Sequence, residues 1–259
     1  MPQNVLIDVT GDHHVHTRYC NHASGEMEEY VHAALARGLR SLTFLEHLEC
    51  GILYDHRTWL TPLHFKDYFR EGRRLQQTYT NRISIRLGVE VGYNPDAEDE
   101  LVAAVDRFPF DHIGLSYHYF FDGTRHLNMV SSRQHNLDAL ERIGVDQVLA
   151  AYFDGLIRAV KILPCQKICH LDAVLRHLPH VTCTQHNRQQ IDRLLKIMAE
   201  KNIALEVNTS GFAHRQEPYP AGDIVTRALN LGIQLIAGSD AHRPDQVGRS
   251  FSKLSEFTR

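Results

Sequence analysis

Two pairs of residues near opposite ends of the chain could bind metal: His14 with His16, and Asp240 with His242. Each pair stands at the end of an apolar run, and its two members lie two positions apart. Residues two apart in a β-strand point to the same side. Each strand end would therefore direct two ligands the same way, as at the mouth of a barrel. The chain also carries 18 histidines among 259 residues, with a formal net charge of only −3.

Polar residues that could bind metal also follow the other apolar runs of the chain. In chain order they are His22, His47, Glu90, His118, His170, Glu206 and Asn208. A single histidine after an apolar run is usually an ordinary loop or core residue, and we interpret in this way those outside the pattern, namely His32, His56, His64, His112, His126, His177, His180 and His186. A polar group at the end of every run favours a site, because active sites of parallel β/α folds lie at these ends.

The expected metal ligands are imidazoles and carboxylates, which suit Zn, Fe or Mn. They are His14, His16, His22, His47, Glu90, His118, His170, Asp240 and His242. A catalytic zinc usually takes three protein ligands and a water, so this set predicts a cluster of two or three ions. Two ions about 3.5–4 Å apart can share a water, lower its pKa toward about 7 and clamp the oxygens of a phosphoryl displacement.

Seven short β-type runs alternate with amphipathic stretches along the chain. The runs cover residues 5–16, 41–46, 83–91, 111–117, 166–171, 203–208 and 233–239. Between them, apolar residues recur at helical spacing, for example over 27–35, 145–163, 191–198 and 224–229. This alternation is typical of parallel β/α architecture. Seven strands could form an open doubly wound sheet or a closed, distorted barrel, and converging ligands at the strand ends favour the barrel.

The chain shows no linker or low-complexity segment that would divide it, so we expect one domain over residues 1–259. Residues 118–143 are the least periodic part and are expected to form a long loop. Five cysteines form no disulfide framework, which favours the reducing cytoplasm. Cys165 and Cys169 lack the second ligand pair of a structural zinc site, and we interpret them as buried side chains beside a strand.

Composition limits the possible partners. Hydrophobic residues make up 43% and charged residues 23% of the chain, as in a globular protein with a sizeable core. The small negative net charge argues against long nucleic acid as a partner but allows a small anionic substrate held by local cations. No apolar stretch approaches the roughly 18 residues of a membrane span, and the N-terminus lacks the pattern of a secretory signal. The oligomeric state is not indicated.

Taken in order, the polar motifs resemble those of the polymerase-and-histidinol-phosphatase (PHP) superfamily. The motifs are Asp-His-His-Val-His-Thr at 12–17, Phe-Leu-Glu-His at 44–47, Leu-Gly-Val-Glu-Val at 87–91, Gly-Leu-Ser-Tyr-His-Tyr at 114–119, His-Leu-Asp at 170–172, Glu-Val-Asn-Thr-Ser-Gly at 206–211 and Gly-Ser-Asp-Ala-His at 238–242. The Phe-Pro-Phe-Asp-His run at 108–112, followed by Asp122-Gly123, is similar to the histidinol-phosphate phosphatase branch. The resemblance spans nearly the whole chain.

This resemblance implies a distorted (β/α)7 barrel with three metal ions that hydrolyses a phosphomonoester, with histidinol phosphate, of histidine biosynthesis, as the branch substrate. The implied ligand sets are His14, His16, Glu90 and Asp240 for one ion, His118 and His170 with the bridging Glu90 for a second, and His22, His47 and His242 for the third. A hydroxide that bridges two ions would attack phosphorus in line. Asp240 or His242 would orient the nucleophile or pass a proton to the departing alcohol.

Some positions depart from the family pattern. Glu46 stands where many members have Asp, and Val91-Gly92-Tyr93 lacks an Asp that is common in the branch. Basic residues that look like the branch's phosphate clamps, Arg215 and Arg176, stand slightly later than that pattern. They would bind phosphate by bidentate, charge-assisted hydrogen bonds. The alternative for Arg215 is a solvated loop cation near Glu217.

Two other functions fit the same residues. One is a PHP-type phosphoesterase that acts on nucleotides or another small phosphomonoester. The other is a metal-binding domain that has lost catalysis. Against this alternative, none of the ligand positions carries an apolar residue. A phosphate-release assay that compares histidinol phosphate with nucleoside phosphates, together with metal analysis, separates the three.

Overall fold

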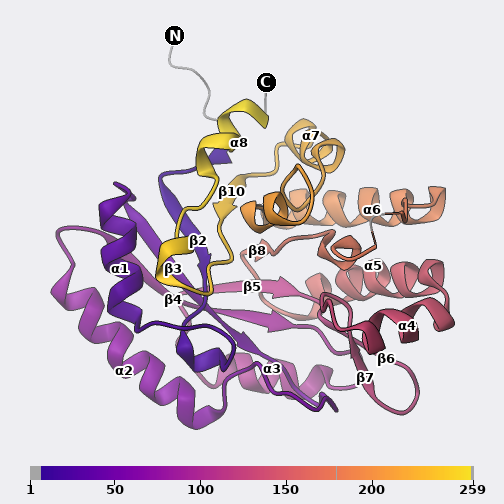
Figure 1. The fold of residues 1–259 in the computed structure, drawn as a ribbon, viewed down its shortest axis with the longest axis horizontal. Helices are drawn as coiled ribbons and strands as arrows, with labels where there is room; N and C mark the ends of the chain where they lie inside the picture. The colour runs from indigo at the N-terminus through magenta and orange to yellow at the C-terminus, as the bar shows by residue number, and fades with distance from the viewer. Residues whose placement is uncertain (1–6, 179, 258–259) are drawn as a thin grey trace.

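A ring of parallel strands forms the centre of the molecule (Figure 1). The computed structural model describes residues 7–178 and 180–257. Its main sheet has the order β1-β10-β9-β8-β5-β4-β3-β2, and all its pairings are parallel. The strands are β1 (Ile7–Asp8), β2 (Gly11–Val15), β3 (Ser41–Leu48), β4 (Ser84–Gly92), β5 (His112–Ser116), β8 (Lys167–Ile168), β9 (Ala204–Asn208) and β10 (Leu235–Gly238). All seven predicted runs are confirmed, except that residues 5 and 6 lie outside the described part.

The first stretch of chain closes the ring. Strands β1 and β2 are separated by only residues 9 and 10, yet β1 pairs with β10 and β2 pairs with β3. At the seam, the amide of His16 donates to the carbonyl of Ala241 at 2.8 Å. The buried Asp12 carboxylate accepts the amides of Ser239 at 2.9 Å and Gly248 at 2.7 Å. The eight strands thus occupy seven positions, which confirms the closed barrel over the open sheet.

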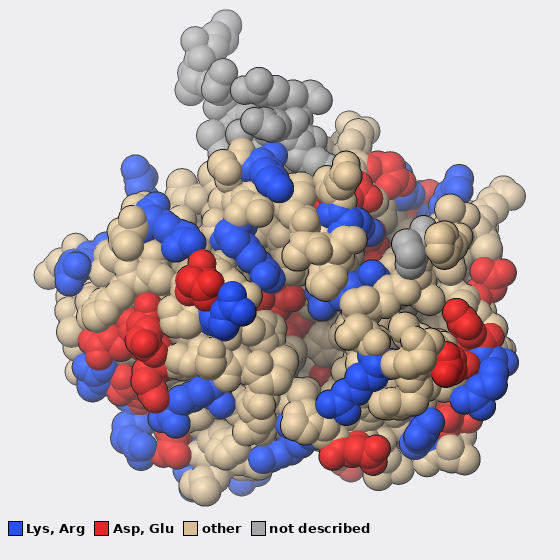
Figure 2. All heavy atoms as spheres, viewed as in Figure 1, with Lys and Arg blue, Asp and Glu red and all other residues tan. Residues whose placement is uncertain are grey.

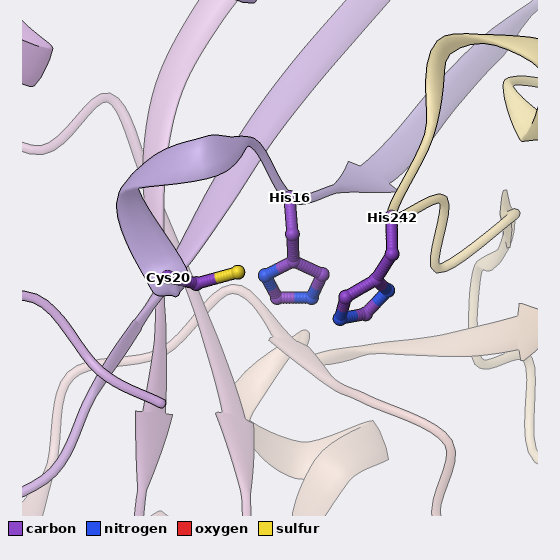
Figure 3. Close-up of side chains that lie close together, drawn as sticks. All are labelled: His16, Cys20 and His242. Carbon is purple, nitrogen blue, oxygen red and sulfur yellow. The ribbon is translucent and has the colours of Figure 1, made fainter. Parts of the chain in front are cut away.

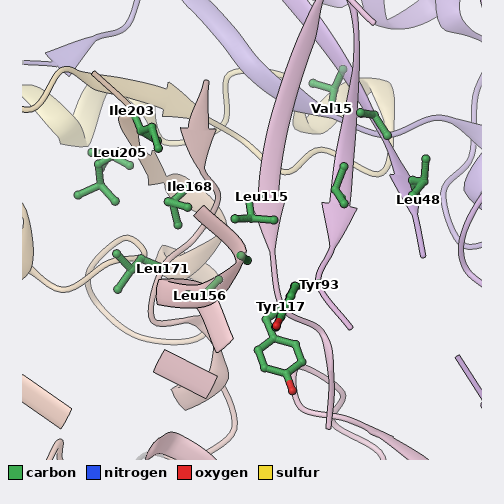
Figure 4. Close-up of a cluster of buried hydrophobic side chains, with 14 of the residues drawn as sticks. Val15, Leu48, Tyr93, Leu115, Tyr117, Leu156, Ile168, Leu171, Ile203 and Leu205 are labelled. Carbon is green, nitrogen blue, oxygen red and sulfur yellow. The ribbon is translucent and has the colours of Figure 1, made fainter. Parts of the chain in front are cut away.

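Helices follow the strands and pack outside the ring. They are α1 (Met27–Ala36), α2 (Pro62–Thr78), α3 (Glu98–Asp106), α5 (Val145–Ile162), α6 (Gln185–Lys201), α7 (Gly222–Asn230) and α8 (Phe251–Phe257). Each of the first six buries apolar side chains against the barrel or a neighbouring helix. Figure 4 shows one part of this core, where Leu115, Ile168 and Leu205 of adjacent strands lie near Leu156 of α5. None of the helices in the described part is long and apolar enough to span a membrane.

The expectation of a long loop over residues 118–143 is wrong. This segment contains an antiparallel hairpin, β6 (Tyr119–Phe121) with β7 (His126–Asn128), and then α4 (Gln134–Ile143). The turn between the strands is held by the Asp122 carboxylate, which accepts the amides of Thr124 and Arg125 at 2.8 and 2.9 Å. Strands of three residues are too short to show alternation. In α4, Leu137, Leu140 and Ile143 do recur at helical spacing, a pattern that the expectation of a loop missed.

Candidate metal centre

The predicted metal ligands converge at one end of the barrel, on the carboxylate of Glu90. The Oε2 atom of Glu90 lies 2.9 Å from His47 Nδ1, and its Oε1 atom lies 2.8 Å from His170 Nε2 and 3.3 Å from His118 Nε2. The Nε2 atoms of His14 and His16 lie 3.5 and 3.6 Å from the same Oε2. Glu90 therefore has three imidazoles beside one oxygen and two beside the other. This arrangement is the one expected of a carboxylate that is shared between two ions.

The remaining predicted ligands adjoin this group. Asp240 Oδ1 lies 3.3 Å from His16 Nε2, and His242 and His22 lie 2.8 Å apart, measured between their Nε2 atoms. Ligand atoms within 4.8 Å of one another form the groups His14–His16–Asp240, His16–His47–Glu90 and His22–His47–His242. All nine predicted side chains are thus brought into one connected cluster, although their ligand role stays a proposal.

The cluster forms because the ligands stand at or just beyond the C-terminal ends of strands in one ring. His14, His47 and Glu90 lie within β2, β3 and β4, whereas His118 and His170 follow β5 and β8. The register of β2 against β3 shifts between Asp12 and Val15, an irregularity typical of barrel rims and active sites. His170 and Asp240 have positive φ angles of 24° and 52°. This backbone conformation costs energy in residues other than glycine, and residues that are held in it cluster at functional sites.

Hydrogen bonds donated by the Nδ1 atoms fix two of the imidazoles at the rim. The Nδ1 atoms of His22 and His242 lie 3.0 Å from the carbonyl oxygens of Cys20 and Asp240. A carbonyl only accepts, so each Nδ1 carries the proton. Burial lowers the pKa of His22 to about 3 and also lowers that of His242, so both rings are neutral. Their Nε2 lone pairs then face each other at 2.8 Å, an arrangement that suits a cation between them.

The carboxylates at the centre are ionised. Burial acts to raise the pKa of Glu90, but His118, His14 and His47 around it hold that pKa well below its ordinary value. For Asp240 burial acts in the same direction, and the hydrogen bond with His16 together with nearby histidines outweighs it. Buried, ionised carboxylates grouped with imidazoles are a donor set for divalent transition metals. The residues present therefore fit a metal cluster.

Two cysteines lie close to these histidines. Figure 3 shows the rings of His16 and His242 beside each other, with Cys20 on the short helical turn that follows His16. Cys20 forms a possible ligand group with these two histidines, and Cys169 forms one with His14 and Glu90. Burial raises the pKa of both thiols, so they are protonated and are poor ligands beside the imidazoles. The expectation of a site without thiolate stands as a prediction.

Comparison with known proteins places the chain in a family. Residues 12–210 match the family model of the PHP domain, and residues 225–259 match the model described as PHP-associated. The chain belongs to the PHP family. Within it, the chain is 32% identical over 247 residues to a Deinococcus radiodurans protein named "Probable histidinol-phosphatase", covering 93% of this chain and 89% of that one. It is 25% identical to the Bacillus subtilis histidinol-phosphatase, covering 95% and 98%. The chain thus falls in the histidinol-phosphatase branch of PHP proteins.

Solved structures share the PHP fold of this chain. A Listeria monocytogenes structure has a TM-score of 0.86 at 20% identity and covers 94% of this chain and 99% of its own. The histidinol phosphate phosphatase of Lactococcus lactis, solved with zinc, L-histidinol and phosphate, has a TM-score of 0.74 at 22% identity and covers 96% and 92%. The predicted barrel is therefore the fold of known PHP structures.

A cavity of about 520 Å³ opens above the cluster of this PHP chain. Its floor includes His47, Glu90, His118, His170 and Asp240. Its walls come from the loop after β3, from the hairpin and the segment after it, and from the loops after β8 and β9; the wall residues are Tyr54, His56, Thr58, Tyr119, Asn128, Val130, Ser131, Ser132, Arg133, Arg176, His177 and His214. Figure 2 shows acidic and basic side chains interspersed around a hollow near the centre of one face. A small anionic molecule fits this space.

The two predicted phosphate-binding arginines differ in position. Arg176 lines the cavity, with its Nη2 atom 3.5 Å from Asp240 Oδ2 and 3.3 Å from Ser210 Oγ. Arg215 instead donates from Nη2 to both oxygens of Asp172 at 2.9 Å, and its guanidinium lies 4.2 Å from the centre of the Tyr219 ring. Among the described residues, Arg215 is not part of the cavity lining. In this structure Arg215 is therefore a partner of Asp172, and its predicted role in phosphate binding stays a prediction.

Several residues of the site could not be assigned from the sequence. Glu49 lies 2.8 Å from His118 Nδ1, and Glu206 lies 2.9 Å from His14 Nδ1, so each orients an imidazole. His177 and His214 line the cavity, although the first was interpreted as an ordinary histidine. Arg133 lines it too, from the segment expected to be a loop. Glu206 alone had a signal, its place at the end of an apolar run.

Proposed function

We propose that this protein is a metal-dependent phosphatase that hydrolyses L-histidinol phosphate to L-histidinol and phosphate in histidine biosynthesis. The observation that carries the proposal is the convergence of seven imidazoles and two carboxylates on Glu90 and its neighbours, at the floor of a cavity of small-molecule size. Curated relatives that span nearly the whole chain carry the name histidinol-phosphatase, which supports this substrate.

The ligands form three sets that would hold two or three ions of Zn, Fe or Mn. His14, His16 and Asp240 with Glu90 would hold one, and His118 and His170 with Glu90 a second. His22, His47 and His242 would hold a third. When bound, such ions supply an acidified water and neutralise phosphate oxygens. The sharing of Glu90 between the first two sets follows from the different imidazoles beside its two oxygens.

Arg176 is the side chain that we assign to the phosphate of the substrate. Its guanidinium faces the cavity beside Asp240, so a phosphate on the floor would lie within its reach. Guanidinium groups bind phosphate by paired, charge-assisted hydrogen bonds. Arg215 would act at a distance, because it holds Asp172 in the loop that carries His170 and Arg176.

Asp240 has two different surroundings, which suggests its role. Its Oδ1 atom faces His16, whereas its Oδ2 atom lies near Arg176 and Ser210. Because this carboxylate is ionised, Oδ2 can accept a hydrogen bond and orient an attacking water toward phosphorus. His242 carries its proton on Nδ1, which is bonded to a backbone carbonyl. We therefore assign orientation of the nucleophile to Asp240, and ligation to His242.

The organic part of the substrate would occupy the outer cavity. Tyr54 and Tyr119 form an edge-to-face pair with ring centres 5.2 Å apart, and both line the wall. Asn128, His177 and His214 supply polar atoms to the same space. An imidazole with an amino group can stack on an aromatic ring and hydrogen-bond to such groups. A cavity of about 520 Å³ is large enough for a small phosphomonoester.

The proposal is tested by measuring phosphate release and metal content on the same preparation. We expect turnover of L-histidinol phosphate with a higher kcat/KM than that of nucleoside monophosphates, in protein that carries two or three ions per chain. Preference for a nucleotide would indicate a different PHP phosphoesterase. Bound metal without release from any phosphomonoester would indicate a domain that has lost catalysis.

A further inference from the structure

A lysine is completely buried inside the barrel, beside the metal centre. Lys167 lies on β8, and its side chain is inaccessible to solvent. Gly114 on the adjacent strand leaves room for it, because a Cβ atom there would lie 2.9 Å from Lys167 Cε and 2.6 Å from Cys169 Sγ. Burying an ammonium group is costly unless it is paired and hydrogen-bonded, so its partners define its role.

Lys167 bonds to two acceptors in the barrel interior. Its Nζ donates to the Glu206 carboxylate and, at 2.8 Å, to the backbone carbonyl of His13. Glu206 is also fully buried, on β9, and accepts from Asn208 Nδ2 at 2.6 Å. The ammonium group and the carboxylate are in direct contact at full burial, so each compensates the charge of the other. The two residues form an ion pair that water does not reach.

The carboxylate of this ion pair contacts a predicted metal ligand, His14. Both oxygens of Glu206 lie 2.9 Å from His14 Nδ1. An ionised carboxylate only accepts, whereas a protonated one could also donate to Nδ1 and move the ring proton to Nε2. Glu206 therefore accepts a hydrogen bond from Nδ1 and turns Nε2 toward Glu90 and Asp240, to within 3.5 and 3.8 Å of their carboxylate oxygens.

We propose that Lys167 is a positioning residue of the metal centre, which acts through Glu206 to fix the tautomer and orientation of His14. The proposal rests on the metal-binding part of the proposed function. Carboxylates that accept from a ligating imidazole are known to set its orientation and basicity. What Lys167 adds is the counter-charge that lets a carboxylate serve this role in a dry barrel interior. His118 has its own carboxylate, Glu49, whose second oxygen has no hydrogen-bond partner in the described structure.

The test is a double-mutant cycle on zinc affinity, with Lys167→Met, Glu206→Gln and the double variant. Zinc dissociation constants are measured by competition with a chromophoric chelator. Each single variant is expected to bind the tightest zinc about 10- to 100-fold more weakly. The double variant is expected to bind no more weakly than Glu206→Gln alone, because Lys167 acts through Glu206. Lys201→Met is the matched control, since this lysine also donates to a backbone carbonyl, of Val160 at 2.9 Å, but lies on α6.

Two outcomes overturn the proposal. Unchanged zinc affinity in folded Lys167→Met would make the lysine a purely structural residue, and additive losses in the double variant would show that it does not act through Glu206. If Lys167→Met does not fold, Lys167→Gln takes its place in the same cycle, and unchanged zinc affinity in that folded variant counts against the proposal. None of these measurements needs turnover, so failure of the substrate assignment would leave them interpretable.

Discussion

The inner and outer parts of the metal centre support their imidazoles differently. His14 and His118 are buried, and their Nδ1 atoms face the carboxylates of Glu206 and Glu49. His22 and His242, at the rim, bond through Nδ1 to backbone carbonyls. A carboxylate makes an imidazole a stronger donor to metal than a neutral carbonyl does. Under the proposed ligand sets, the inner ions would therefore bind tightly and the rim ion would exchange more easily.

The largest effect is expected at the carboxylate that joins the inner sets. Glu90→Gln keeps the size of the side chain but removes the charge that five imidazoles face. Phosphate release should fall by about 10³-fold or more, because the charge that organises the ions is lost. His14→Ala and Asp240→Asn should likewise abolish turnover and lower bound metal. Metal analysis and circular dichroism on each variant check that the fold remains.

If Glu90→Gln retained wild-type metal and turnover, the site assignment would be wrong. The comparison between inner and outer histidines would then lose its basis as well.

The next largest effect is expected on metal content, and it distinguishes the rim of the metal centre from its interior. His242→Ala should lower bound metal by about one ion per chain and leave the inner ions in place, because four-coordinate sites rarely survive loss of a protein ligand. His118→Ala should instead weaken the sites around Glu90. Titration of the wild-type protein with a chelator should remove the rim ion first. Simultaneous release of all ions, or equal losses of bound metal in the two variants, would contradict a difference in metal affinity between the rim and the interior.

A smaller effect is expected from the carboxylate behind His118. Glu49→Gln removes its charge but keeps an acceptor for Nδ1, so metal affinity should fall about 10-fold, the low end for such changes. Glu46→Gln is the matched control, because this buried carboxyl group lies on β3, three positions before Glu49, but accepts from the amide and hydroxyl of Thr17. Zinc competition measures both. A larger loss of zinc affinity in Glu46→Gln than in Glu49→Gln would show that a carboxylate facing an imidazole contributes no more to zinc binding than another buried carboxyl group.

The residues of the floor could be predicted from sequence, whereas those behind them could not. The C-terminal ends of parallel strands meet at one end of a ring, so residues as distant as His14 and Asp240 were expected to lie together. The partners of the imidazoles follow a different rule. Whether Lys167 reaches Glu206, or Glu49 reaches His118, depends on how the interior of the barrel is packed, and strand periodicity carries no information on that packing.

The same limit applies to the arginines and to the hairpin. Arg176 and Arg215 were expected to have similar roles because both look like the phosphate clamps of the histidinol-phosphate phosphatase branch, yet their partners depend on the paths of two loops. The strands of the hairpin pair only with each other, away from the main sheet. Their pattern was too short to read, so a wall of the cavity was interpreted as a loop.

The smallest effects compare these two arginines, one facing the cavity and one facing the protein. Arg176→Ala should raise KM for L-histidinol phosphate roughly tenfold, the value of a lost charge-assisted hydrogen bond, with little change in stability. Arg215→Ala should leave KM nearly unchanged but lower the free energy of unfolding by about 2–3 kcal/mol, because it leaves the buried Asp172 carboxylate without its partner. Steady-state kinetics and denaturant unfolding of both variants separate the two roles. A raised KM in Arg215→Ala with unchanged stability would return that residue to the phosphate, and would show that its contact with Asp172 gives way when substrate binds.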